Sequence, residues 1–312
     1  MNIQLIQGDS LEVLRQMESE SINCVITSPP YYGLRDYGTG IWEGGDPECP
    51  HYRTSKRSDK TITGHKNMVD SGHPVGDAIY KTVCPLCGAV RVDKQVGLEE
   101  TPEEYVEKLV QIFREVRRVL KKDGTVWLNM GDTYCITAQN QYKSKDLIGI
   151  PWQVAFALRN DGWYLRQDII WHKPNPMPES ASDRCTKSHE YIFLLTKSPK
   201  YYFNYEAIKE PCTSEKGYRR KRDVWTIATK PYKEAHFATF PEELVAPCLL
   251  AGCPEQGTAL DLFAGAGTVG VVCKKNKRNF IGIELNPEYI SIATARIIKI
   301  PETLTNLQEK TQ

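Results

Sequence analysis

A strand-like stretch near the start of the chain ends in residues that could hold a planar ring carrying an amine. Apolar and β-branched residues at 22–27 predict a buried strand. Ser28-Pro29-Pro30-Tyr31 must end it in a stiff loop, because each proline lacks an N–H and fixes φ. A ring could stack on Tyr31 while its amine donates hydrogen bonds to the Ser28 hydroxyl and the Pro29 carbonyl. The alternative is a proline-terminated strand with a surface tyrosine.

A second stretch, in the last third of the chain, has the order of a nucleotide-binding βαβ unit. A strand at 258–263 enters a glycine turn at 264–268, and a helix then leads to a strand at 279–284 that ends in Glu284. An acid at that place can bind two ribose hydroxyls, and Asp261 could hold a ligand ammonium. No Lys or Arg follows the turn to hold a pyrophosphate, so S-adenosylmethionine fits this pattern. The alternative is a plain βαβ turn.

The stretch 42–95 has little hydrophobic periodicity and contains residues with metal-ligand spacing. Cys84-Pro-Leu-Cys87-Gly is one half of a zinc knuckle, whose tight turn directs both thiolates to one ion. Cys49 and His51 could complete a tetrahedral Zn²⁺ site that staples a segment poor in apolar residues. Spare ligands are His65 and His73. The Cys-x-His spacing is tighter than usual, and the alternative is a disordered loop with incidental cysteines.

The elements that must position these residues alternate between strands and helices. Strands are predicted at 3–6 and 125–130, at 164–172 and at 190–196, the last two paired with each other. Helices are predicted after Asp9 or Ser10, which can cap the first of them, from Thr101-Pro102 to the basic residues before Gly124, and at 151–160. This alternation predicts an α/β fold.

Basic residues in two loops are candidates for contact with nucleic acid. The loop 173–189 contains three prolines that keep it extended, and 215–222 is the strongest local cationic run. The candidates are Arg35, Lys173, Arg184, Lys187, Arg219, Arg220 and Arg222. Such a run is usually a solvated loop, but phosphate contact is favoured next to a nucleic-acid site.

Composition sets bounds without naming a function. The chain has 312 residues, a formal net charge of +1 and ten cysteines. No stretch resembles a signal peptide or a spanning helix, so we expect a cytoplasmic protein with reduced thiols and no membrane contact. Because the net charge is small, contact with DNA would depend on local basic clusters.

With both motifs in view, the chain resembles the DNA amino-methyltransferases, which methylate cytosine N4 or adenine N6, and in particular their β class, in which the catalytic motif precedes the cofactor motif. Thr27-Ser-Pro-Pro-Tyr31 matches the catalytic motif, Asp261-Leu-Phe-Ala-Gly-Ala-Gly-Thr268 the glycine motif and Glu284 the ribose acid. Gly8-Asp9 is similar to the adenine-contacting segment. His236-Phe-Ala-Thr-Phe-Pro241 resembles the segment beside the methionine end of the cofactor. The match covers most of 1–40 and 96–300.

The resemblance implies a fold, a division of the chain and a set of site residues. The fold is a Rossmann-like methyltransferase sheet flanked by helices, with a small Cys/His-containing insertion and a small target-recognition region. The methyltransferase domain is expected to comprise 1–41, which carries the catalytic motif, 96–175, and the cofactor-binding half 236–300. Between these parts lie a zinc-binding insertion at 42–95 and a region with a β-hairpin that recognises the target at 176–235. Residues 301–312 form a C-terminal tail. Catalytic candidates are Ser28, Pro29, Pro30 and Tyr31. Cofactor candidates are Asp9, His236, Phe240, Asp261, Phe263, Ala264, Gly265, Gly267, Thr268, Glu284 and Asn286.

The expected reaction follows from this resemblance. Serine in the first position of the Pro-Pro-Tyr motif usually accompanies cytosine N4 methylation in the family, and aspartate accompanies adenine N6, with exceptions. We therefore expect transfer to N4 of a cytosine rotated out of duplex DNA, with adenine N6 as the alternative. Expected partners are double-stranded DNA, a cognate restriction endonuclease and a second copy of the chain. Rival functions are a non-catalytic zinc-dependent DNA-binding protein and a methyltransferase of RNA or of a protein amide.

Overall fold

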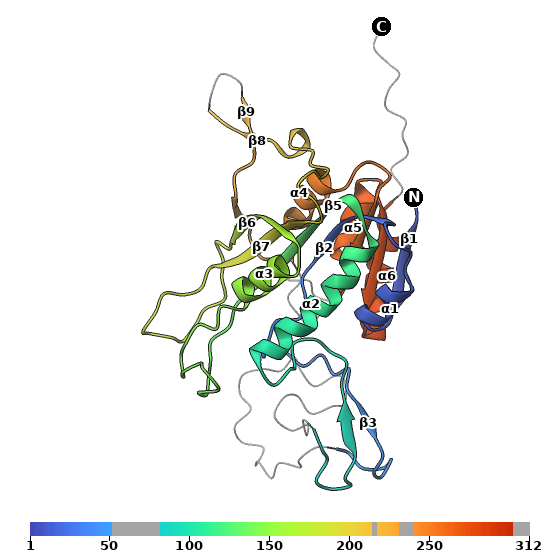
Figure 1. The fold of residues 1–312 in the computed structure, drawn as a ribbon, viewed down its shortest axis with the longest axis vertical. Helices are drawn as coiled ribbons and strands as arrows, with labels where there is room; N and C mark the ends of the chain where they lie inside the picture. The colour runs from blue at the N-terminus through green and yellow to red at the C-terminus, as the bar shows by residue number, and fades with distance from the viewer. Residues whose placement is uncertain (52–81, 214–216, 231–239, 302–312) are drawn as a thin grey trace. The chain divides into compact units, whose positions relative to one another are not determined.

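The computed structural model describes residues 1–51, 82–213, 217–230 and 240–301. The chain divides into two compact units (Figure 1). One comprises Met1–Arg35 with Val96–Gln312, and the other comprises Asp36–Gln95. In the part of the chain that is described, no helix is both long enough and apolar enough to cross a membrane.

The larger unit contains an eight-stranded sheet. Its strand order is β1 (Ile3–Gln7), β12 (Asn279–Glu284), β11 (Thr258–Asp261), β2 (Ile22–Thr27), β5 (Leu120–Met130), β7 (His189–Thr196), β6 (Tyr164–His172) and β10 (Val224–Thr226). Strand β7 runs antiparallel to β5 and β6, while the other neighbours pair in parallel. The predicted pairing of 164–172 with 190–196 is confirmed. Strand β5 begins before the predicted Thr125, because Leu120 already pairs with Ile22 ahead of an irregularity in the register.

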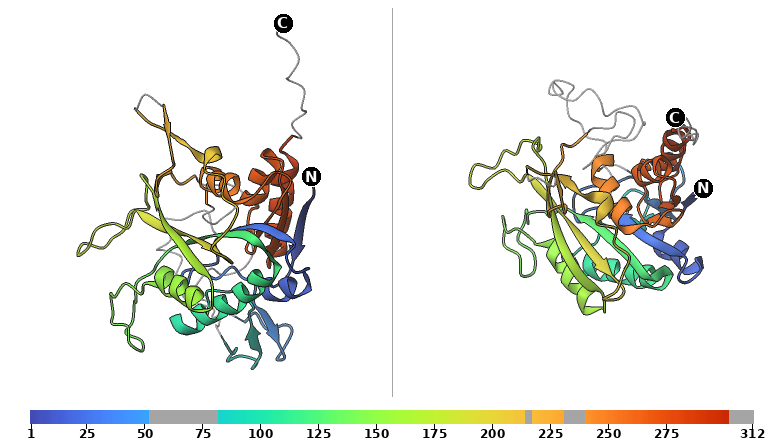
Figure 2. Two further views of the ribbon diagram at one scale, coloured as in Figure 1. Left: turned by 45° about the horizontal axis from the view of Figure 1, so that its top comes forward. Right: turned by 90° about the horizontal axis from the view of Figure 1, so that it is seen from above.

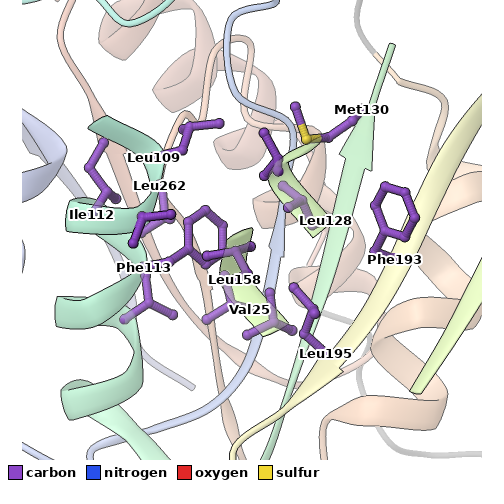
Figure 3. Packing of buried hydrophobic residues seen from close by; sticks show 14 of the residues in the cluster. Val25, Leu109, Ile112, Phe113, Leu128, Met130, Leu158, Phe193, Leu195 and Leu262 are labelled. Atoms are coloured by element: carbon purple, nitrogen blue, oxygen red, sulfur yellow. The ribbon is translucent and has the colours of Figure 1, made fainter. Parts of the chain in front are cut away.

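Helices cover both faces of this sheet (Figure 2). They are α1 (Ser10–Gln16), α2 (Pro102–Val119), α3 (Ile150–Asn160), α4 (Glu242–Gly252), α5 (Thr268–Lys275) and α6 (Pro287–Ile298), with a 3₁₀ turn η1 at Glu206–Ile208. Successive residues of a strand point to opposite faces, and β2 shows the result. Val25 packs in the cluster formed with α1, α2 and α3 (Figure 3), whereas Cys24 and Ile26 pack in the cluster formed with α4, α5 and α6. A strand covered on both faces must be apolar throughout, which explains the run at 22–27.

Helix α2 illustrates how local sequence sets an element. Thr101 and Glu104 form a capping box, Pro102 occupies the first turn, and Arg117 and Arg118 lie in the last turn. Its apolar face is buried, with Leu109 and Phe113 fully inaccessible. The helix supports the sheet beneath the Ser28–Tyr31 loop.

Short antiparallel pairs complete the fold. In the smaller unit, β3 (Ile41–Glu43) pairs with β4 (Val90–Val92). In the larger unit, β8 (Glu210–Pro211) pairs with β9 (Tyr218–Arg219), within the region predicted to recognise the target. Pairs this short need further support to hold their shape.

Candidate active site

The two predicted motifs meet at the middle of the sheet, where the strand order reverses. Strand β11 lies beside β2 in parallel, with Leu260 opposite Val25. The chain continues from β11 to β12 on one side, while β5 lies on the other side of β2. Ligands of open α/β sheets bind at the carboxyl ends of the strands at such a switch point. The Ser28–Tyr31 loop and the glycine turn both leave their strands at this edge.

A buried hydrogen bond joins the two motifs. The Thr27 hydroxyl donates to Asp261 Oδ1 at 2.8 Å, and the Phe263 N–H donates to the same oxygen at 3.2 Å. Asp261 is 1% exposed. Burial raises the pKa of Asp261 to about 7, against the lowering effect of these two donors. The free carboxyl group is therefore close to its titration midpoint at neutral pH, and a nearby cation would favour the charged form.

The glycine turn leaves open backbone at the sheet edge. Gly265 has φ +49°, and a Cβ there would meet only the Phe263 carbonyl oxygen at 4.0 Å, so a ligand can approach closely. Gly267 has φ +74° and serves a different purpose. A Cβ there would lie 2.8 Å from the Cβ of Ala293, so this glycine lets α5 and α6 pack together. The turn fits a ligand that contacts backbone at Gly265.

Glu284, at the end of β12, faces this turn. Its carboxylate accepts hydrogen bonds from the backbone N–H groups of Gly265 at 2.8 Å and Asn286 at 2.9 Å. Burial raises the pKa of Glu284 from its usual value, while these donors hold it down. Each carboxylate oxygen has a second lone pair, so the group can still accept two hydroxyl donors. Gly8 donates its N–H to the Glu284 carbonyl, which places Gly8-Asp9 beside the same site.

The remaining cofactor candidates cap helices, are buried or line a hollow, and one lies outside the described residues. The Asp9 carboxylate caps α1 by accepting from Leu11 and Glu12, as the sequence predicted for Asp9 or Ser10. Ala264 and Thr268 are buried, and Thr268 accepts a hydrogen bond from Arg296. Phe240 lines a narrow apolar hollow together with Thr27 and Asn129. Phe263 is half-buried, Asn286 caps α6, and His236 lies outside the described residues.

The Ser28–Tyr31 loop is held from several sides. The Tyr105 hydroxyl of α2 donates to the Pro30 carbonyl at 2.9 Å, and the Tyr32 hydroxyl donates to the Glu100 carbonyl at 3.0 Å. The Gly33 N–H donates to the Gly97 carbonyl at 2.9 Å. Ser28 is half-buried, with its hydroxyl 3.4 Å from the Tyr31 hydroxyl. The loop is therefore fixed before any ligand arrives.

Glu190, which the sequence did not single out, fixes the tyrosine of this loop. The Tyr31 hydroxyl donates to Glu190 Oε2 at 2.7 Å, and the Asn129 amide donates to the same oxygen at 3.2 Å. Lys173 forms an ion pair with the other carboxylate oxygen. Burial is the main cause, and the negative charge of Glu190 the second, of a pKa of Tyr31 well above its usual value. The phenol therefore stays neutral. The ring also packs against Gly131, where a Cβ would lie 2.4 Å from Tyr31 Cε2.

Little in the sequence indicated this network. Asn129 lies within an apolar strand, and Glu190 follows His189 at the start of another. The only usable signal was a polar residue at the end of a buried strand, next to Gly131-Asp132. Four predicted metal ligands, in contrast, are brought together as a group in the smaller unit: Cys49, His51, Cys84 and Cys87.

The predicted DNA-contacting residues are largely engaged within the chain. Lys173 pairs with Glu190, Arg184 pairs with Glu179, and Arg219 and Arg222 both pair with Glu210. The Arg220 guanidinium lies 4.6 Å from the Tyr205 ring centre, and Arg35 is exposed. Lys187 lines a hollow of about 360 Å³ with Asp132, His189 and Tyr191, among others, and burial lowers the pKa of its ammonium. This hollow and the narrow one lined by Phe240 both lie near the ends of β5 and β7.

The strand order, the reversed β7 and the glycine turn define an α/β fold of the methyltransferase type. The PvuII DNA methyltransferase, described as cytosine-N4-specific, matches 97% of this chain and 89% of its own with a TM-score of 0.65 and 18% identity. The TTHA0409 protein of Thermus thermophilus, a putative DNA modification methylase complexed with S-adenosyl-L-methionine, matches 95% of this chain and 93% of its own with a TM-score of 0.57 and 22% identity. The predicted fold class is confirmed.

Sequence comparison identifies the family within this fold. The DNA methylase family of N6 and N4 methyltransferases matches residues 22–295. The type II methyltransferase M.Cfr9I of Citrobacter freundii is 43% identical over 316 aligned residues, which cover 94% of this chain and 87% of that enzyme. The chain belongs to the N6/N4 DNA methylase family, and it is a DNA methyltransferase.

Proposed function

We propose that this protein is the modification enzyme of a type II restriction–modification system and methylates N4 of cytosine in duplex DNA with S-adenosylmethionine as donor. The observation that carries the proposal is the Thr27–Asp261 hydrogen bond, which ties the Ser-Pro-Pro-Tyr loop to the glycine turn at one sheet edge. A methyl donor on the turn and an amine on the loop would then be close enough to react.

The glycine-turn side suits the methyl donor. Gly265 offers open backbone to the nucleoside, Glu284 can accept the two ribose hydroxyls, and the Asp261 carboxylate can pair with the donor's ammonium. Asp9 and Phe263 are proposed to border the adenine. When bound, S-adenosylmethionine supplies a methyl group on a positively charged sulfur. The chain's own residues would hold that group in place.

The loop side suits the acceptor amine. The base must leave the duplex to be reached, and Tyr31 would stack on it with about 1–3 kcal/mol. The Ser28 hydroxyl and the Pro29 carbonyl would accept hydrogen bonds from the amine, which draws its lone pair out of conjugation with the ring. The nitrogen lone pair would then be free to form the new bond to the methyl carbon as the carbon–sulfur bond of the donor breaks. Because the methylated amine is briefly cationic, it loses a proton to water readily, and the step depends mainly on positioning.

Glu190 is proposed as a positioning residue for this stack. Its carboxylate fixes the Tyr31 hydroxyl at 2.7 Å and is itself held by Asn129 and Lys173. A ring fixed in this way loses little conformational entropy when the base arrives. The loop is thereby organised for stacking before DNA binds.

Three observations favour cytosine N4 and a type II role. The motif begins with Ser28, and serine at this position usually accompanies N4 methylation in the family that the sequence resembles. M.Cfr9I, at 43% identity, carries the type II description, and the similarly folded PvuII enzyme is described as cytosine-N4-specific. A cognate restriction endonuclease is the partner that this role implies.

The test uses the purified protein, donor labelled in the methyl group, and duplex DNA, RNA and protein as separate acceptors. We expect label in duplex DNA, with N4-methylcytosine released on digestion and identified by mass spectrometry. N6-methyladenine as the product would overturn the assignment to cytosine but not the conclusion that the protein is a DNA methyltransferase. Label in RNA or protein, with none in DNA, would overturn the proposed substrate.

A further inference from the structure

The smaller unit contains a compact group of soft ligands that DNA methylation does not use. One donor atom from each of Cys49, His51, Cys84 and Cys87 lies within 4.8 Å of all the others. We propose that these four side chains bind one Zn²⁺ as a structural site, and that the metal holds the unit Asp36–Gln95 together. The ligands come from two segments far apart in sequence, so the ion would close the loop between them.

The distances between the ligand atoms are those of a tetrahedral zinc site. Cys49 Sγ lies 3.7 Å from Cys84 Sγ, and Cys87 Sγ lies 3.6 Å from His51 Nδ1. With Zn–S of about 2.3 Å and Zn–N of about 2.0–2.1 Å, tetrahedral angles place two sulfurs about 3.8 Å apart, and a sulfur and a nitrogen about 3.6 Å apart. A disulfide would need sulfurs about 2.05 Å apart. The spacing fits a shared ion.

The backbone around these ligands is shaped to bring them together. In the Cys84–Gly88 turn, the Gly88 N–H donates to the Cys84 carbonyl at 2.8 Å, and Gly88 has φ +77°. The Cys84 N–H in turn donates to the Ala89 carbonyl at 2.8 Å. Gly45 permits close approach, because a Cβ there would lie 2.8 Å from Cys87 Sγ. This is the turn expected of a zinc knuckle.

The histidine ligand is also held in place. His51 has φ +56°, a conformation that non-glycine residues adopt infrequently. Its ring stacks on Trp42 of β3, with ring centres 4.5 Å apart and planes at 14°. The strained backbone and the stacking together direct Nδ1 toward Cys87. The tight Cys-x-His spacing is therefore compatible with a shared site.

The ligand set selects the metal and its role. Three thiolates and one imidazole in a tetrahedron favour Zn²⁺ over harder ions such as Mg²⁺ or Ca²⁺. All four positions are filled by protein, which leaves none for a reacting water, so the site is structural.

The unit also needs such support. Among its described residues only Cys84, Ala89 and Gln95 are buried, and its sheet has three residues on each strand. An antiparallel pair of that size is marginal without a core or a metal.

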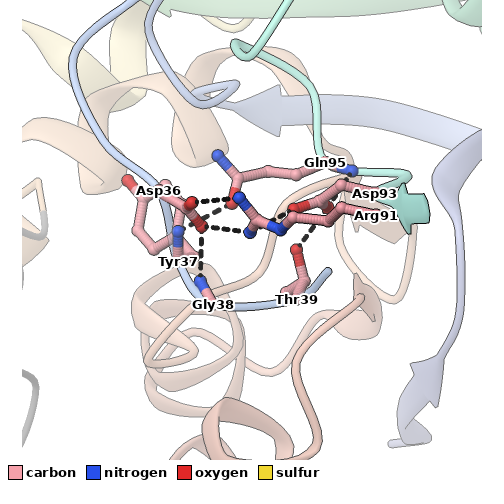
Figure 4. A network of polar contacts seen from close by, with 7 residues as sticks. All are labelled: Asp36, Tyr37, Gly38, Thr39, Arg91, Asp93 and Gln95. Carbon is pink, nitrogen blue, oxygen red and sulfur yellow. Dashed lines mark hydrogen bonds and ion pairs between the residues drawn. The ribbon is translucent and has the colours of Figure 1, made fainter. Parts of the chain in front are cut away.

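A polar network closes the same unit where its two segments enter and leave it (Figure 4). The Arg91 guanidinium pairs with Asp36 at 2.7 Å and with Asp93 at 2.9 Å. Thr39 donates to Asp93 at 2.8 Å, and the Tyr37 N–H donates to the Gln95 side chain at 2.7 Å. These bonds join 36–39 to 91–95 through polar groups. They leave the Cys49–Cys87 end to be closed by the metal.

The test measures metal content and ligand geometry in the full-length protein, purified in a reductant that does not chelate. We expect stoichiometric zinc by plasma mass spectrometry and loss of most of it in Cys84→Ser and in Cys87→Ser. The matched control is Cys185→Ser, since Cys185 is an exposed cysteine outside the group, and it should keep its zinc. Removal of the metal should expose new protease cleavage sites within 36–95.

Cobalt exchange provides a measurement that needs no variant to fold. Wild-type protein loaded with Co²⁺ should show thiolate-to-cobalt charge-transfer absorption and the intense visible bands of tetrahedral coordination. Weak octahedral bands, absence of metal from the wild type, or a Cys49–Cys84 disulfide in peptide mapping would overturn the proposal. Full zinc retention in both cysteine variants would do the same. None of these readouts depends on methyl transfer, so failure of the proposed function leaves this test intact.

Discussion

The Thr27 hydroxyl and the Asp261 carboxylate share a 2.8 Å hydrogen bond although 234 positions separate them in the chain. Both residues are at most 1% exposed. A buried carboxylate without donors would be held neutral, so Thr27 controls how readily Asp261 carries the charge that an ammonium ligand requires.

Replacement of Thr27 should therefore change the pH dependence of donor binding. Thr27→Val removes a donor to the carboxylate and should raise the pKa of Asp261 above its value of about 7. A group with a raised pKa is ionised only at higher pH, so S-adenosylmethionine should bind the variant more weakly near neutrality and approach wild-type affinity at alkaline pH. Calorimetry across about two pH units on either side of the pKa measures the donor affinity of wild type and of Thr27→Val. Titration of the ligand affects both proteins equally, so it cancels in the ratio of the two affinities.

The control for this variant is Thr125→Val. Thr125 is also buried, and its hydroxyl donates to the Gly252 carbonyl rather than to Asp261. It should leave the pH dependence of the affinity unchanged even if it lowers stability. A constant affinity ratio between wild type and Thr27→Val at every pH would show that Asp261 does not bind the ammonium.

Loss of the Ser28 hydroxyl should slow methyl transfer while leaving donor binding intact. Ser28→Ala removes one hydrogen-bond acceptor for the target amine, which is worth about 1–3 kcal/mol, or roughly 5-fold to 150-fold in kcat. Single-turnover transfer of labelled methyl groups measures the rate, and calorimetry measures the donor affinity. Ser21→Ala, which alters a half-buried serine bonded to the Glu18 carbonyl, is the control. Equal turnover of Ser28→Ala and wild type would exclude the proposed role.

Much of this architecture could be predicted from local patterns. The apolar run 22–27 predicted a strand covered on both faces of the sheet. The strand–turn–helix–strand order of 258–284 predicted that Glu284 lies beside a glycine turn. Parallel strands with carboxyl ends at one edge then bring the two motifs together. Each of these inferences needs only a short stretch of chain and the rules of sheet construction.

The contacts of Tyr31 could not be predicted in this way. The sequence indicated a tyrosine available for stacking but not the partner of its hydroxyl. Glu190 is 159 positions away, and its approach depends on β7 being antiparallel to β5, with Tyr191 opposite Met130. A shift of one residue in that register would turn Glu190 to the other face of the sheet. Such information lies in the pairing of strands rather than in any one of them.

The coupling of Tyr31 and Glu190 can be measured with a double-mutant cycle. Tyr31→Phe keeps the stacking ring and loses the hydroxyl, whereas Glu190→Gln keeps the shape and loses the charge that Lys173 pairs with. Each variant should lower kcat, and the double variant should lose less than the product of the two single effects, because both changes act on the same Tyr31–Glu190 contact. Fluorescence of 2-aminopurine at the target position would report whether the base still leaves the duplex. Multiplicative effects on kcat would show that the two residues act separately.

Arg220 should contribute more to DNA affinity than the arginines beside it. Arg219 and Arg222 share the Glu210 carboxylate, which offsets part of their charge, while the exposed Arg220 lies over the Tyr205 ring. Arg220→Ala should weaken binding to specific and non-specific duplexes alike and reduce the slope of log K against log salt by about 1, as expected for loss of one phosphate contact. Arg114→Ala, on α2 and paired with Asp161, is the charge-matched control and should leave the slope unchanged. If both variants give the same salt dependence, Arg220 makes no phosphate contact, and the phosphate contacts come from other residues.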